Sequence, residues 1–243
     1  MTRFFVAILS VLLIAGTAAG LQSNPLRDRL LGSSRQQETT GWYQRADTGS
    51  FFLFDRSRSV ALLRERDDPT AEVLVLFPNR APGGGTAFVT DTGREVIRLT
   101  GLGGATYFPA DAPNGVIADF ASAAGSLAPS PRSPEEVRAL AEQVAEDFAD
   151  LVGDNIDLGY APAPRAGLGV QYDAFRMLAI AVQRIDDERR RVRGIDRVSV
   201  TIGSEPGAYR DDRAFVIVIA PNYGYAGRPS SEFIMGALLD GNA

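Results

Sequence analysis

The side chains that could do chemistry in this chain are few, because it contains no Cys, no His and no Lys, and all 25 of its basic residues are arginines. Without His, no side chain titrates near neutral pH at its ordinary pKa, and the usual base for a nucleophilic Ser is missing. Without Cys and His, the common zinc, copper and iron sites lose their ligands. The sequence therefore predicts no metal site and no cofactor, and carboxylates remain as the only acid–base groups.

Acidic side chains near the C-terminal end could support glycoside hydrolysis, which uses two carboxylates about 5–9 Å apart on either side of a sugar. Those expected in or beside loops are Asp154, Asp157, Asp173, Glu205, Asp211 and Asp212. Sequence alone does not give the distances between them, and 30 acidic residues make chance pairs frequent. We assign no catalytic residue, and a carboxylate-dependent hydrolase acting on cell-envelope glycan is kept as the alternative function.

Three other motifs favour structural roles. The glycines of Gly101-Leu102-Gly103-Gly104 precede a strand pattern instead of a helix, which indicates a hairpin and not a dinucleotide loop. The serine of Gly203-Ser204-Glu205-Pro206-Gly207 is off-centre for a nucleophile elbow, so this segment is expected to be a turn. The arginines of 189–193 follow three acidic residues, an order that matches the dipole at the end of a solvated helix.

The segment 221–231 is the best candidate for binding, because it follows a buried strand and combines aromatic rings with hydrogen-bond donors suited to a sugar or a peptide. The four candidate binding residues are Asn222, Tyr223, Tyr225 and Arg228. In the competing interpretation, which we favour, both tyrosines cover the edge of the core while Ser230 or Ser231 caps the last helix.

The elements expected to position these residues begin with a β-rich region at 41–120. Short aromatic and β-branched runs alternate there with turn residues, which predicts a strongly twisted antiparallel meander that closes partly on itself. The runs are Trp42–Arg45, Phe51–Phe54, Val60–Leu63, Val73–Phe77, Ala87–Thr90, Val96–Leu99, Ala105–Phe108 and Val116–Ala118. Asp-Thr-Gly occurs twice between runs, and its glycine suits a hairpin position with positive φ.

A small-residue linker at 121–132 leads into an α/β region at 133–243. Ser133 followed by Pro134 and two glutamates predicts a helix N-terminus, and Gly153 ends that helix. The remaining elements expected are a helix at 172–193, strands at 198–202 and 214–220, and a helix at 231–239. The fold class is therefore α+β, an N-terminal antiparallel β-rich meander followed by a helix-helix-strand-strand-helix region, in one domain or two.

The N-terminus has the pattern of a secretory signal peptide at 1–20. Arg3 precedes an apolar run over 4–14, and small residues suitable for cleavage follow. The run is shorter than the roughly 20 apolar residues of a membrane span, and a polar arm at 21–40 follows it. Without Arg3 the chain has a net charge of −6, which argues against nucleic acid as a partner, and no stable membrane span is expected after cleavage.

Several short motifs resemble an uncharacterised exported protein family of alphaproteobacteria, a domain of unknown function. They are Asn24-Pro25-Leu26-Arg27-Asp28-Arg29-Leu30, Phe52-Leu53-Phe54-Asp55-Arg56, Ile97–Thr106 and Ala226-Gly227-Arg228-Pro229-Ser230-Ser231. The resemblance covers most of the chain after the signal peptide and implies export to the periplasm by the general secretory route, but it carries over no catalytic residue. We therefore expect a non-catalytic periplasmic binding or interaction protein, with an envelope protein or a glycan as its partner.

Overall fold

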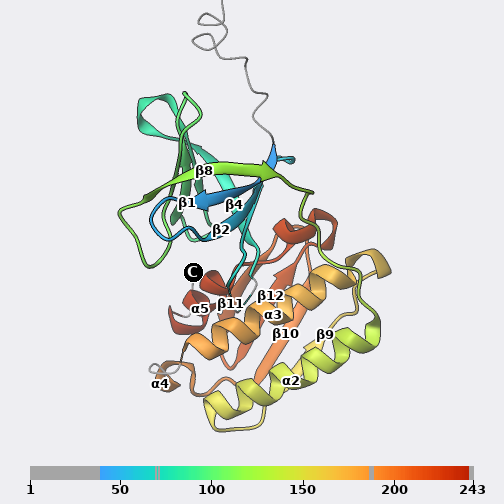
Figure 1. Ribbon diagram of the computed structural model, residues 1–243. Coiled ribbons are helices and arrows are strands. Elements are labelled where there is room, and N and C mark those ends of the chain that lie inside the picture. Colours follow the sequence, from blue (N-terminus) through green and yellow to red (C-terminus); the bar gives the residue numbers. More distant parts are fainter. Residues whose placement is uncertain (1–38, 69, 71, 186–188, 241–243) are drawn as a thin grey trace, which may run out of the picture. The chain divides into compact units, whose positions relative to one another are not determined.

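The computed structural model describes residues 39–68, 70, 72–185 and 189–240. The predicted signal peptide and nearly all of the predicted arm therefore lie outside the described residues. Eight strands form the first part of the described chain (Figure 1). They are β1 Thr40–Arg45, β2 Phe51–Asp55, β3 Ala61–Glu65, β4 Leu74–Arg80, β5 Thr86–Val89, β6 Glu95–Leu99, β7 Ala105–Tyr107 and β8 Val116–Ala123.

These strands form a closed antiparallel barrel in which each strand pairs with the next and β1 pairs with β8. Each of the eight predicted runs corresponds to one strand, and the meander closes completely. The two Asp-Thr-Gly segments form hairpin turns in which Gly49 and Gly93 have φ of 74° and 83°, the conformation that glycine adopts without steric cost. The expected linker at 121–132 begins inside β8, which continues to Ala123.

The barrel interior is a packed core, because alternate residues of each strand point inward. The buried side chains inside it are Tyr43, Phe52, Phe54, Ala61, Leu63, Leu76, Phe88, Val96, Ile97, Leu99, Ala105, Tyr107 and Ala118. The ring of Phe52 lies between two others, with centroids 5.6 Å from Tyr43 and 4.4 Å from Tyr107. Aromatic rings thus fill the space that a wider barrel would leave for a ligand.

The second part combines helices with a four-stranded mixed sheet of order β11-β12-β10-β9. Its elements are α2 Pro134–Val152, β9 Asp157–Tyr160, α3 Leu168–Arg184, α4 Arg189–Val192, β10 Arg197–Ile202, β11 Gly207–Asp211, β12 Ala214–Ile219, η4 Pro221–Gly227 and α5 Ser231–Asp240. Short 3-10 turns also occur at η1 Pro82–Gly84 and η2 Arg165–Gly167. Mixed α and β content is therefore confirmed, but the expected element order lacked β9 and β11, and the second helix begins at Leu168 instead of residue 172.

Helix α2 begins and ends as its sequence predicts. The Ser133 hydroxyl accepts a hydrogen bond from the Glu136 backbone N–H at 3.2 Å, and the Glu136 carboxylate accepts one from the Ser133 N–H at 2.8 Å. Gly153 ends the helix in the left-handed conformation. The buried stripe that includes Val144 and Phe148 belongs to the hydrophobic core shared with α3 and the sheet, so burial adds to the local signals that stabilise this helix.

The sheet buries one face under its helices and places the binding segment at the end of its central strand. Val198 and Val200 of β10 and Ile217 and Ile219 of β12 are fully buried on the covered face, whereas the alternate residues are partly exposed. Strand β12 lies between two partners, as its apolar sequence predicts, and leads directly into η4 and α5. Among the described helices, none has the length and apolar character needed to cross a bilayer.

Candidate functional site

The η4 segment separates the four residues that the sequence suggested for binding. The Ala220 N–H donates to the Gly227 carbonyl at 2.7 Å and closes the turn. Asn222 and Tyr223 are exposed, Tyr225 is partly buried, and Arg228 is buried. The structure therefore brings Tyr225 and Arg228 into contact, with the central guanidinium carbon 5.7 Å from the ring centroid, while Asn222 and Tyr223 are exposed.

Arg228 is part of a buried ion pair that ties η4 to α3 and to the segment before β4. Its Nε donates to Asp173 Oδ2 at 2.6 Å and its Nη2 donates to the Val73 carbonyl at 2.8 Å. Asp173 also pairs with Arg176 at 3.1 Å. The Arg228 side chain is completely buried, and its charge is compensated inside the protein.

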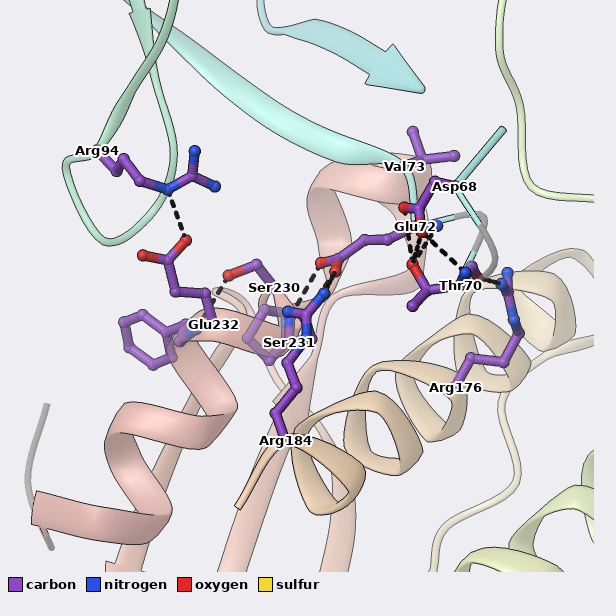
Figure 2. A network of polar contacts seen from close by, with 12 residues as sticks. Asp68, Thr70, Glu72, Val73, Arg94, Arg176, Arg184, Ser230, Ser231 and Glu232 are labelled. Carbon is purple, nitrogen blue, oxygen red and sulfur yellow. Dashed lines mark hydrogen bonds and ion pairs between the residues drawn. The ribbon is translucent and has the colours of Figure 1, made fainter. Parts of the chain in front are cut away.

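The N-terminus of α5 is bound by two carboxylates from the barrel part, which we call the carboxylate cap, formed by Glu72 and Asp91. The hydroxyl and backbone N–H of Ser231 donate to Glu72 at 2.5 and 3.1 Å, and those of Ser230 donate to Asp91 at 2.6 and 2.7 Å. Figure 2 shows Glu72 meeting Ser231 together with Arg184, whose Nη2 lies 3.6 Å from the carboxylate. Carboxylates at this position satisfy free N–H groups and oppose the positive end of the helix dipole.

Two further contacts accompany the carboxylate cap in Figure 2. Arg94 of the β5–β6 turn pairs with Glu232 of α5 at 3.0 Å, and Arg176 donates to the Thr70 carbonyl at 2.5 Å. Ser230 also caps α5, since its hydroxyl accepts a hydrogen bond from the Phe233 N–H at 3.0 Å. The charged groups around this helix end are therefore used in internal contacts.

A pocket of about 130 Å³ lies beside the carboxylate cap. Its lining residues come from β4, the β5–β6 turn, the start of β11, η4 and α5, and they are Val75, Phe77, Asp91, Pro206, Gly207, Ala226, Arg228, Pro229 and Phe233. The side chains of Asp91 and Arg228 are already hydrogen-bonded to other groups, so the lining that the pocket presents to a ligand is mainly apolar. Pockets that hold a whole ligand measure about 300–1,000 Å³, and a cavity of about 150 Å³ holds a benzene-sized group. This pocket therefore fits one side chain.

Tyr225 lies on the outer surface of the barrel, where it covers a small apolar cluster. The buried members of this cluster are Leu53, Leu62, Val73, Val75 and Leu127. Burial is the main cause that raises the pKa of the Tyr225 phenol, and the charge of Asp173 adds to it, whereas nearby guanidinium groups such as Arg228 act in the opposite direction. The phenol is thus neutral at physiological pH and can take part in hydrogen bonds.

The six candidate carboxylates differ in their surroundings. Asp173 is bound by two arginines. The others are exposed, and they are Asp154, Asp157, Glu205, Asp211 and Asp212. Among the described residues, no cluster of three or more acidic, His or Cys side chains could hold a metal ion.

Glu72, Asp91 and Asp173 were missed by sequence reasoning as partners of the binding segment. Glu72 and Ser231 are 159 positions apart, and no local pattern links them. Asp91 begins an Asp-Thr-Gly motif, which predicts a turn but does not predict a partner for the Asp91 carboxylate. The paired serines before α5 were the one available signal, because they indicate a helix cap near which an acidic partner is favourable.

The chain matches the family described as Domain of unknown function (DUF4908) over residues 25–238. The chain belongs to the DUF4908 family. The match includes every barrel strand, the mixed sheet, η4 and most of α5, so the carboxylate cap and the pocket both lie within the DUF4908 region. Neither the comparison with curated proteins nor that with solved structures gives a match.

Proposed function

We propose that this DUF4908 protein is an exported, non-catalytic binding protein of the bacterial envelope, and that it recognises a protein partner through the pocket beside the carboxylate cap. The single observation that supports this proposal is the apolar pocket of about 130 Å³, whose size suits one inserted side chain. Partner recognition often depends on one anchor residue that fills such a pocket.

The charges around the pocket support binding over catalysis. Arg228 compensates Asp173, and the Asp91 carboxylate accepts two hydrogen bonds from Ser230. A general acid or base needs a free proton-transfer site near the substrate, and these groups are engaged elsewhere. The exposed part of the Phe77 ring, 40% of the residue, extends the apolar surface at the pocket and gives a partner further contact area.

The pocket can be tested with short peptides of sequence Gly-Gly-X-Gly-Gly, followed through the methyl NMR signals of Val75. We expect saturable shifts when X is Leu or Phe and none when X is Gln. The dissociation constant should be on the order of 10–100 mM, because one buried apolar side chain contributes only about 1.5–3 kcal/mol.

A variant that fills the pocket provides the control for this experiment. Ala226→Leu should abolish the shifts because its side chain occupies the pocket, whereas Ala121→Leu, at an exposed position of β8, should leave them unchanged. Equal shifts with the Gln peptide, or shifts that persist in Ala226→Leu, would contradict the proposal.

Export is supported by the pattern of residues 1–20 and is tested separately. Cell fractionation should place the protein in the periplasm, and N-terminal sequencing should begin after Ala19 or Gly20. Recovery of the protein from the cytosol with residues 1–20 still attached would refute this part of the proposal and leave the pocket experiment unaffected.

A further inference from the structure

The outer face of β1, β2 and β3 carries aromatic and basic side chains side by side. Trp42 pairs in register with Leu53, and Leu53 pairs with Arg64, so the three side chains form one row across neighbouring strands. Residues adjacent to this row, such as Tyr43 and Phe52, belong to the barrel core. The row therefore points outward from the barrel, as the alternation of a β-strand requires. Its middle residue, Leu53, is buried in a cluster with Leu127, and Trp42 packs against this cluster and is partly exposed.

Arg66 extends this surface and is held in place by two rings. The carbon at the centre of its guanidinium group lies 4.5 Å from the ring centroid of Trp42 and 4.4 Å from that of Phe51. Such cation–π contacts fix the guanidinium plane. Within the described part of the chain, no hydrogen bond or ion pair engages the N–H groups of the Arg66 side chain, so an oriented set of donors faces solvent.

The arginines of this surface form no ion pair with the acidic groups described near them, although Glu65 and Asp67 line a small pocket together with Phe51. No carboxylate oxygen of the residues described lies within ion-pair distance of Arg64 or Arg66, although the chain as a whole has a net charge of −5. The positive charge of Arg64 acts to lower the pKa of the Tyr225 phenol, although burial has the larger, opposite effect. Arg64 therefore lies close enough to Tyr225 to affect it electrostatically. We call Trp42, Phe51, Arg64 and Arg66 the arginine–aromatic strip.

We propose that the arginine–aromatic strip binds the surface of an anionic phospholipid bilayer. Guanidinium groups form paired hydrogen bonds with phosphate oxygens. Tryptophan and phenylalanine insert at the boundary between headgroups and acyl chains. The rest of the protein has a net negative charge, so an anionic bilayer repels it. The strip would therefore face the bilayer and orient the protein on it. This site is separate from the proposed pocket and does not depend on it.

Trp42 is the single tryptophan of the chain, so its fluorescence reports directly on the strip. Vesicles of equal parts phosphatidylglycerol and phosphatidylcholine should shift the emission to shorter wavelength, and brominated acyl chains should quench it. Vesicles of phosphatidylcholine alone should do neither. Raising the ionic strength from about 0.01 M to about 1 M should release the protein, because the Debye length falls from about 30 Å to about 3 Å.

Charge variants of the full chain test the arginines themselves. Arg64→Gln combined with Arg66→Gln should weaken binding to the anionic vesicles roughly thirtyfold, because each basic side chain at such a surface contributes a factor of roughly five. The matched control is Arg80→Gln combined with Arg165→Gln, two exposed arginines outside the strip. It removes the same charge and should change binding less than twofold. The N-terminal residues are the same in every variant, so their contribution cancels.

Three results would overturn the proposal. They are equal binding to neutral vesicles, equal loss in both double variants, and displacement from vesicles by inorganic phosphate at a concentration that leaves the surface charge of the vesicles unchanged. The last result would assign the strip to a soluble phosphate compound. If Arg64→Gln with Arg66→Gln does not fold, quenching of Trp42 by brominated lipid in the unmodified protein still decides between the outcomes.

Discussion

At the scale of single residues, the ion pair between Asp173 and Arg228 predicts a large loss of stability on mutation. Both side chains are buried, with exposed fractions of 6% and 0%. Asp173→Ala should lower the free energy of unfolding by about 3–5 kcal/mol, because it leaves a buried guanidinium group without its counter-charge. Denaturation in urea measures this loss. Asp154→Ala, at an exposed position, should change the stability by about 0.5 kcal/mol or less.

Replacing both partners of this pair distinguishes the charge from the packing. Asp173→Leu combined with Arg228→Met should be less destabilising than Asp173→Ala alone, because no unpaired charge remains in the interior. A double variant as unstable as the single one would show that the geometry of the hydrogen bonds to Val73 and Arg176 matters more than charge compensation.

Asp55 predicts how stability depends on pH. Burial opposes its ionisation, but hydrogen bonds from Ser57, Thr40 and the Leu127 backbone outweigh burial and lower its pKa. A carboxyl group with a lowered pKa in the folded state binds protons more readily when unfolded. Its contribution is therefore complete above the unfolded pKa, about 3.9, and is lost as the pH falls through the folded pKa.

The test compares acid titrations of stability for the unmodified protein and Asp55→Asn. Other carboxyl groups whose pKa is lowered, such as that of Asp111 beside Arg45, contribute equally to both curves. The variant should be less stable at neutral pH, and its stability should decline less steeply below about pH 4. Parallel curves would contradict the role assigned to Asp55.

Sequence reasoning identified residues with suitable chemistry but not their partners. It selected Arg228 and Tyr225 from a local cluster of aromatic and polar types, and the structure places these two in contact, but it did not identify the other partners of Arg228. Arg228 meets Asp173 and Val73, which are 55 and 155 positions away. The arginine–aromatic strip likewise depends on strand register, which places Trp42 and Arg64 in one row and which the sequence does not specify.

At the scale of elements, the N-terminus of α2 is the clearest target. Ser133→Ala removes the capping box and should lower the free energy of unfolding by about 1 kcal/mol, because the Glu136 backbone N–H loses its acceptor. Urea denaturation provides the measurement. Ser204→Ala, in the exposed turn after β10, serves as the control and should have no measurable effect.

Elements with strong local patterns were predicted, and those formed by pairing were not. The barrel strands have alternating apolar residues and glycine-containing turns, and α2 has both of its caps. Strand β9 contains a glycine and exposes two of its four residues, so its sequence has little strand character. It forms because it pairs in parallel with β10. Strand β11 begins with Gly207 and depends in the same way on β12.

At the scale of the whole molecule, the carboxylate cap couples the barrel to the C-terminal sheet, since Glu72 and Asp91 both bind α5. Glu72→Gln combined with Asp91→Asn should raise hydrogen exchange at the Phe233 and Ile234 amides at least about tenfold, because loss of charge-assisted hydrogen bonds favours local opening of the helix. Asp119→Asn, an exposed substitution on β8, should leave those rates unchanged.

The closure of the barrel by β1 and β8 also sets the order in which the molecule can be completed. Gly41 pairs with Ala123, and the Ala124 N–H donates to the Thr40 carbonyl. Strand β1 therefore gains its second pairing partner only when β8 is in place. Whether the chain emerges from a ribosome or from a secretion pore, the free edge of β1 stays open to other extended chains until Ala123 has emerged. Cells that make this protein rapidly would therefore benefit from a chaperone that shields that edge during the delay.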